Sequence, residues 1–177
     1  MAVLVEAVSV IIKASAIQEK YPGGWKKFKA NLPNRTMCTD GELIRVGFMV
    51  PGDARAFVRE LESFGFVSLV NNSAQDIATV SQSYGLTTPC PWIELLEVTL
   101  HGNPPKSVMA CRLVGSNMQE VVFPEYWKFE DSMSDMTIID LNDQDNGMIF
   151  YEHKDSVDVY VDPRTGKKLY VGRTQPR

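Results

Sequence analysis

Cysteine and histidine are scarce in this sequence, and their scarcity excludes several kinds of chemistry. The three cysteines, Cys38, Cys90 and Cys111, are an odd number without a C-x-x-C pair, which fits neither a secreted disulfide framework nor a zinc module. The two histidines, His101 and His153, are too few for a histidine-rich metal centre. We therefore expect no metal ion, and we expect a reducing compartment, the cytoplasm.

Motifs that bind nucleotides or form a hydrolase site are missing as well. The chain contains no G-x-G-x-x-G and no G-x-S-x-G, so neither a dinucleotide site nor a hydrolase nucleophile elbow is predicted. We expect no cofactor. No segment approaches the ~20 apolar residues of a membrane span, and Glu6 interrupts the apolar N-terminus where a signal peptide needs an unbroken run.

The sequence also lacks an excess of basic residues. It has 18 Lys and Arg against 22 Asp and Glu, a formal net charge of −4. Because non-specific binding to nucleic acid depends on clustered Lys and Arg, we expect no nucleic acid as a partner, and the missing span argues against a membrane. The hydrophobic fraction of 44% and the charged fraction of 23% are typical of a folded globular protein.

The first half of the chain predicts a βαββαβ order. An apolar, β-branched run indicates the first strand, helical spacing of apolar residues indicates the helices, and Asp40-Gly41 is a two-residue hairpin turn. The expected elements are a strand over 3–13, a helix from Ser15 capped with Gln18, a helix over 25–32, strands over 36–39 and 42–50, a helix over 54–64 and a strand over 66–70. This order is typical of a ferredoxin-like sandwich, in which Trp25 and Phe64 would be buried on one face of the sheet.

The second half predicts antiparallel β structure. Residues 84–91 are rich in Pro, Gly and Thr and are the best candidate for a linker. A hairpin over 92–100 and 106–114 follows, then shorter strands over 120–123, 136–141, 148–153, 157–161 and 167–171. We therefore predict an α+β protein with a ferredoxin-like region over 1–86 and a β-rich region over 87–177, either as two domains or packed into one.

One functional hypothesis is a small enzyme or ligand-binding protein with a pocket between the two halves. In it Cys90, or Cys38 beside the Asp40 turn, would be the nucleophile, and His101 or His153 the base. A thiol nucleophile needs a lowered pKa next to a cation. A Cys within hydrogen-bond reach of a His in a deep pocket would favour this hypothesis.

The second hypothesis is a non-catalytic binding module, and it rests on the unequal distribution of charge. Residues 1–86 hold nine Lys and Arg against eight acids, whereas the rest of the chain holds nine against fourteen. Acids beside large aromatic residues form a surface that attracts and anchors a basic protein partner. The partner-binding candidates are Trp127, Phe129, Asp131, Asp135, Asp140, Asp143 and Asp145.

We favour the binding module, a bacterial interaction or regulatory protein that resembles a toxin-neutralising immunity protein in charge and size only. The alternative interpretation of the same residues is that the aromatic rings belong to the core and the acids form a solvated face. An exposed aromatic patch ringed by carboxylates would favour the module.

Overall fold

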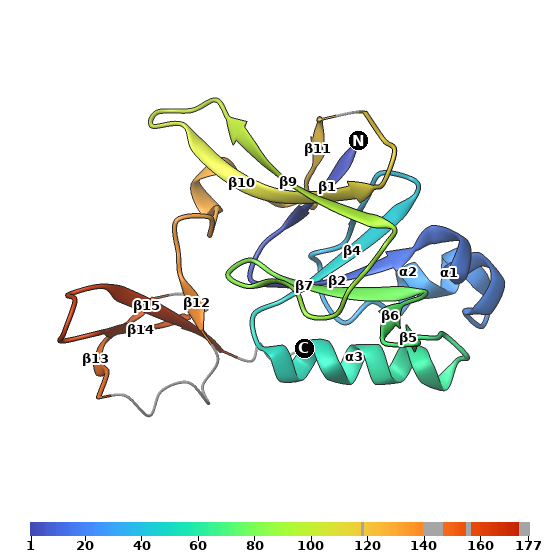
Figure 1. The fold of residues 1–177 in the computed structure, drawn as a ribbon, viewed down its shortest axis with the longest axis horizontal. Helices are drawn as coiled ribbons and strands as arrows, with labels where there is room; N and C mark the ends of the chain where they lie inside the picture. The colour runs from blue at the N-terminus through green and yellow to red at the C-terminus, as the bar shows by residue number, and fades with distance from the viewer. Residues whose placement is uncertain (118, 140–146, 155–156, 174–177) are drawn as a thin grey trace.

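The computed structural model describes residues 1–117, 119–139, 147–154 and 157–173. These residues form a mixed α+β structure with three α-helices and four sheets (Figure 1). The prediction of an α+β protein is confirmed. No described helix is long and apolar enough to cross a membrane.

The central sheet has five strands in the order β3-β4-β2-β7-β8, and every neighbouring pair is antiparallel. Its strands are β2 (Val8–Lys13), β3 (Cys38–Thr39), β4 (Leu43–Phe48), β7 (Ile77–Ser81) and β8 (Gly85–Leu86). The predicted hairpin around Asp40-Gly41 is present, since β3 and β4 flank it and Gly41 has φ +93°. The predicted strand over 66–70 is wrong. Only β5 (Leu69–Val70) forms there, paired with β6 (Ser73–Ala74), and β7 takes the place beside β2.

Three helices cover one face of the central sheet: α1 (Ala14–Lys20), α2 (Gly24–Ala30) and α3 (Pro51–Ser63). The helix-side core consists of Val8, Val10, Ile12, Ala16, Ile17, Tyr21, Phe28, Ile44, Val46, Ala54, Phe57, Leu61, Phe66 and Ile77. Trp25 and Phe64 pack against it as predicted, but they remain half-buried. The predicted capping box is wrong, because Ser15 lies inside α1 and the N-cap residue, Lys13, makes no side-chain capping bond.

The predicted single strand over 3–13 is divided between two sheets. Ala7 has φ +49°, a left-handed conformation that is uncommon for any residue except glycine, and it turns the chain between β1 (Ala2–Val5) and β2. Both parts are buried on both faces, as an apolar run predicts. The break lets the first residues of the chain enter a second sheet.

The second sheet has the order β11-β1-β10-β9 and packs on the face of the central sheet opposite the helices. Its further strands are β9 (Ile93–Leu100), β10 (Lys106–Leu113) and β11 (Val121–Val122), and β9 and β10 form the predicted hairpin. The inter-sheet core consists of Val3, Val5, Ile11, Cys38, Leu43, Ala74, Ala78, Val80, Cys90, Ile93 and Cys111. Residues on both sides of position 87 therefore share one sheet and one core.

A third sheet, in the order β12-β15-β14-β13, lies at one side of the molecule (Figure 1). Its strands are β12 (Ile138–Ile139), β13 (Ile149–Lys154), β14 (Val157–Val161) and β15 (Lys168–Gly172). Gly172 lies so close to Met49, just after β4, that a Cβ atom at position 172 would overlap the Met49 carbonyl group. This close backbone approach joins the third sheet to the central one.

We expect Gly172→Ala to destabilise the protein by about 1–3 kcal/mol, the usual cost of overpacking a filled site. The obstacle is a backbone carbonyl, which cannot rotate away as a side chain does. Gly52→Ala is the matched control. Gly52 is an exposed residue of α3, and a Cβ atom there would lie 3.9 Å from its nearest neighbour, the Arg55 side chain. It should be neutral or stabilising by up to about 1 kcal/mol. Urea unfolding of both variants measures the difference, and equal midpoints would contradict the expectation.

Candidate partner-binding surface

Trp127, Phe129, Asp131 and Asp135, four of the residues predicted to bind a partner, lie on a segment that runs from β11 past the β9–β10 hairpin to β12 (Figure 1). We call residues 123–136 the strap. It contains one short 3-10 helix, η1 (Phe129–Asp131), and otherwise no regular structure. Its position depends on hydrogen bonds to other parts of the molecule.

Glu6 holds the strap at two points. The side chain sits at the junction of β1 and β2, and the residue is only 3% exposed. Its Oε1 accepts a hydrogen bond from the indole Nε1 of Trp127 at 2.7 Å, and its Oε2 accepts one from the backbone N of Met133 at 2.6 Å. A buried carboxylate needs such donors, because burial without them costs several kcal/mol. Glu6, beside the break at Ala7, therefore anchors a segment more than a hundred positions away.

Arg45 lies beside Glu6 and is buried as well. The guanidinium donates from Nε to Ser9 Oγ at 2.9 Å, from Nη2 to the Glu6 carbonyl O at 3.1 Å and from Nη1 to the Thr36 carbonyl O at 3.2 Å. Burial lowers the pKa of Arg45, and the nearby Cys38 and Glu6 oppose that shift. The Arg45 guanidinium thus donates hydrogen bonds to three acceptors near the junction of β1 and β2.

Gln82, in the turn between β7 and β8, holds the end of the strap. Its Nε2 donates to the carbonyl O of Met133 at 2.5 Å and of Met136 at 3.1 Å. Its Oε1 accepts from the backbone N of Ala7 at 2.9 Å, and its own backbone N donates to the Ala7 carbonyl O at 2.8 Å. The strained Ala7 conformation and the strap are thus fixed by the same residue.

The aromatic residues of the strap differ in exposure. Trp127 is half-buried and stacks on Phe123 with ring centroids 4.3 Å apart. Phe129 is half-buried, rests on Gly102 and lies 5.0 Å from Lys106 Nζ. Tyr126 is 57% exposed, and Arg35 both covers its ring and donates to its hydroxyl at 2.9 Å. The two predicted anchors therefore keep only part of their rings at the surface.

The acidic residues of the strap face the solvent. Asp131 and Asp135, both predicted from the sequence, are exposed, as are Glu125 and Glu130. Lys128 is the one basic residue within residues 123–136, all of which the structure describes. Asp140, Asp143 and Asp145 lie outside the described residues. The strap therefore carries four exposed carboxylates against one ammonium group.

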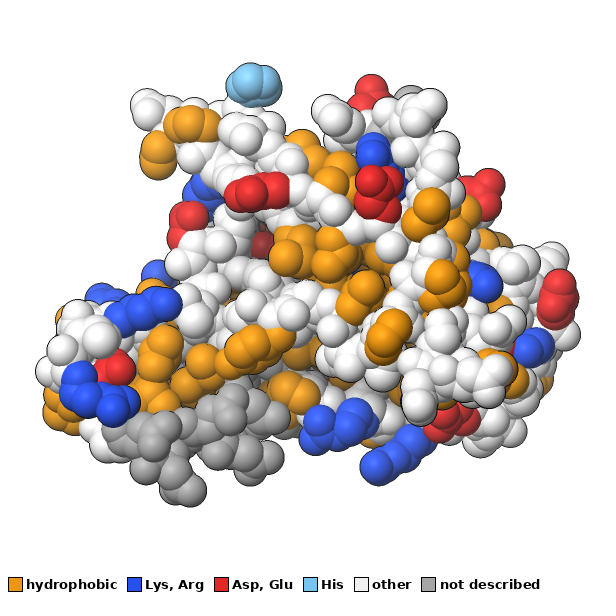
Figure 2. All heavy atoms as spheres, in the orientation of Figure 1, with side chains coloured by type: hydrophobic (Ala, Val, Ile, Leu, Met, Phe, Trp, Pro, Cys, Tyr) orange, Lys and Arg blue, Asp and Glu red, His pale blue; other side chains and the backbone are white. Residues whose placement is uncertain are grey.

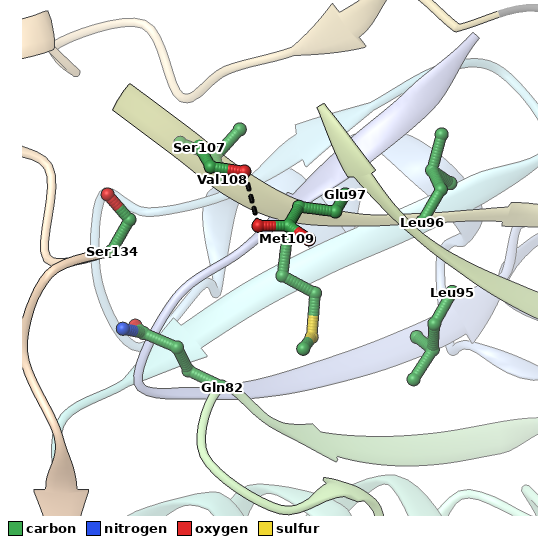
Figure 3. A pocket seen from close by; sticks show the side chains of 8 residues that line it. All are labelled: Gln82, Leu95, Leu96, Glu97, Ser107, Val108, Met109 and Ser134. Atoms are coloured by element: carbon green, nitrogen blue, oxygen red, sulfur yellow. Dashed lines mark hydrogen bonds between the residues drawn. The ribbon is translucent and has the colours of Figure 1, made fainter. Parts of the chain in front are cut away.

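A pocket of about 420 Å³ lies where the strap, the β9–β10 hairpin and Gln82 meet (Figure 3). Its lining residues are Gln82, Leu95, Leu96, Glu97, Ser107, Val108, Met109 and Ser134. Ser107 Oγ donates to the Glu97 carboxylate at 2.5 Å. Figure 2 shows hydrophobic side chains gathered in the hollow below β9, with both acidic and basic side chains above it. The pocket combines apolar side chains with one carboxylate, that of Glu97.

The cysteines and histidines of the enzyme hypothesis are not brought together. Cys90 belongs to the inter-sheet core, His101 lies in the exposed loop between β9 and β10, and His153 lies in β13, where its Nδ1 is 2.5 Å from Asp158. Within the described part of the chain no hydrogen bond joins Cys90 to either histidine.

Burial keeps the thiols protonated. It raises the pKa of Cys38 to about 11 and also raises the pKa of Cys90 and of Cys111. A nucleophilic thiol needs the opposite shift. Among the described residues, no three His, Cys, Asp or Glu side chains are placed to hold a metal ion.

No protein-family model, no curated protein and no solved structure matches the chain.

Proposed function

We propose that the protein is a non-catalytic interaction module that binds a basic protein partner. The observation that supports this proposal is the fixed acidic strap: Glu6 and Gln82 hold its backbone, while Glu130, Asp131 and Asp135 are exposed. Carboxylates on a fixed segment attract a basic surface over a distance of about 8 Å at physiological ionic strength. A cluster of one sign also repels acidic competitors, which gives selectivity.

Aromatic contact completes the proposed surface. Phe129 keeps part of its ring at the surface next to Asp131, and the exposed Tyr126 lies on the same strap. Aromatic side chains supply most of the binding energy in many interfaces. Trp127 contributes only its apolar surface to a partner, because its indole N–H already donates to Glu6.

The proposal predicts a charge-dependent association rate. The triple variant Glu130→Gln, Asp131→Asn, Asp135→Asn removes three negative charges from the strap. Its association rate should be several-fold lower and less dependent on salt than that of the parent, and its dissociation rate should change little. The probe is a labelled eight-residue peptide with the repeat Val-Val-Lys-Lys, the length of β9, in which valine and lysine follow one another along each face of the extended chain. Stopped-flow kinetics at two salt concentrations measure both rates.

The matched control removes the same charge elsewhere. Glu19, Glu42 and Glu60 are exposed residues outside the strap, and their replacement by Gln should leave the association rate near that of the parent. If the two triple variants associated equally slowly, the effect would come from net charge, and this result would contradict a local binding surface on the strap. Trp127→Ala is unsuitable for this test because it also removes a partner of Glu6.

We also propose that the N-terminal unit is a ferredoxin-like sandwich that works in the cytoplasm. The antiparallel order β3-β4-β2-β7, with helices connecting β2 to β3 and β4 to β7, supports the fold. The three free, buried cysteines support a reducing compartment.

A further inference from the structure

Strand β9 forms an edge of the second sheet. The order β11-β1-β10-β9 places β10 on one side of it, and no strand of the described residues pairs with its other side. The strand is eight residues long, which is unusual for an edge, since most proteins shorten or cover their edge strands. Within the described residues, no hydrogen bond uses the outer N–H groups of β9 from Leu95 onward, and these groups can pair with an added strand.

The hydrogen-bond register identifies these outer groups. The backbone N of Val114 donates to the Trp92 carbonyl O, which makes Trp92 and Val114 a hydrogen-bonded pair. In an antiparallel ladder such pairs alternate, so the N–H groups of Glu94, Leu96, Val98 and Leu100 point toward β10. The N–H groups of Ile93, Leu95, Glu97 and Thr99 then point away from the sheet.

The pocket lies along the same edge. Leu95 and Met109 line its apolar part, and Glu97 lies on the edge strand itself (Figure 3). An added strand sends alternate side chains to each face of the sheet. Leu95, Glu97 and Met109 share one face of the sheet, the pocket side. Apolar side chains of the added strand on that side would enter the pocket, and a Lys or Arg two positions along, on the same side, would meet the Glu97 carboxylate.

We propose that β9 accepts an extended segment of the basic partner, which adds to the second sheet as a new edge strand. Main-chain hydrogen bonds to Leu95, Glu97 and Thr99 supply affinity, and apolar side chains in the pocket with a basic side chain at Glu97 supply selectivity. This inference rests on the proposed function and names the partner's binding segment: extended, with apolar and basic residues two positions apart, so that both kinds occur on the pocket side.

Charge decides between this occupant and a second copy of the chain. The sequence of β9 contains two acids, Glu94 and Glu97, and no base. Glu94 forms an ion pair with Arg112 of β10 at 3.1 Å, so Glu97 is the acid of β9 that a partner would meet. Pairing two copies of β9 would bring two Glu97 carboxylates together without an added base, and like charges on neighbouring strands are destabilising. A basic segment removes that repulsion.

The test compares Thr99→Pro with Thr99→Ala, using the same valine–lysine peptide as the probe. Proline removes the outward N–H of Thr99 and its ring obstructs the edge, whereas alanine keeps the N–H. We expect Thr99→Pro to weaken peptide binding about ten-fold or more and Thr99→Ala to leave it unchanged. The side chain of Thr99 is exposed and its N–H does not bond β10, so folding should be preserved in both variants.

A second measurement uses the parent protein alone. Hydrogen exchange with and without the peptide should show new protection at the amides of Leu95, Glu97 and Thr99. Peptide binding that depends on Asp131 and Asp135 but leaves these amides and the Thr99→Pro variant unaffected would overturn the strand addition and leave the proposed function standing. Absence of peptide binding would overturn both. A concentration-dependent dimer that Thr99→Pro abolishes would overturn the choice of occupant.

Discussion

Glu6→Ala is expected to destabilise the protein by about 3–5 kcal/mol, the cost of removing one partner from a buried charged network. The change leaves the indole N–H of Trp127 and the backbone N–H of Met133 without their acceptor at the buried junction of β1 and β2. It also removes the carboxylate that partly balances the buried Arg45. Urea unfolding at equilibrium measures the loss as a lower midpoint.

Two comparisons separate the role of this carboxylate from its size and charge. Glu6→Gln keeps the shape but turns one acceptor into a donor, so we expect a smaller loss of about 1–3 kcal/mol. Glu125→Ala removes an exposed acid of the strap and should change stability by less than about 0.5 kcal/mol. If Glu6→Ala were as mild as Glu125→Ala, the bonds to Trp127 and Met133 would contribute nothing to the fold.

Gly47→Ala is expected to cost about 3 kcal/mol, the upper part of the range for overpacking. A Cβ at position 47 would overlap the guanidinium of Arg45, which three hydrogen bonds hold in place. The backbone cannot yield either. The Gly47 N donates to Thr36 Oγ1 and its carbonyl O accepts from Asn34 Nδ2, both at 2.7 Å. The free energy of unfolding measures the effect.

A double-mutant cycle shows whether the clash with Arg45 is the cause. In an Arg45→Ala background the guanidinium is absent, so adding Gly47→Ala should cost much less than it does in the parent. The two residues are in contact, and the coupling energy of such pairs is usually about 0.5–3 kcal/mol. A cost that is the same in both backgrounds would place the strain elsewhere.

The sequence predicts the elements whose determinants are local. The hairpin at Asp40-Gly41 and helix α3 are both present, because a turn dipeptide and the spacing of Ala54, Phe57 and Leu61 act over a few residues. The β9–β10 hairpin is present for the same reason. The sequence does not predict that β7 is the strand that pairs with β2, because this pairing depends on contacts across the sheet rather than on a local pattern.

The anchor of the candidate surface was missed, although the sequence contains a signal for it. Glu6 is the one acid in a buried apolar run, and such an acid requires distant partners. Those partners, Trp127 and Met133, cannot be identified from spacing, since they are more than a hundred residues away. The exposure of Asp131 and Asp135 was predictable, because short acidic side chains beside turns are solvated by default.

The anchoring of the strap by Glu6 is the step on which the candidate surface depends, and hydrogen exchange of two protons tests it most directly. The indole N–H of Trp127 and the amide N–H of Met133 should exchange slowly in the parent, because both donate to a buried carboxylate. Glu6→Gln keeps only one acceptor oxygen, so at least one of the two protons should exchange ten-fold faster or more, while amides of the helix-side core such as Leu61 keep their protection. Rapid exchange of the two protons in the parent, or unchanged exchange in the variant, would contradict the anchor.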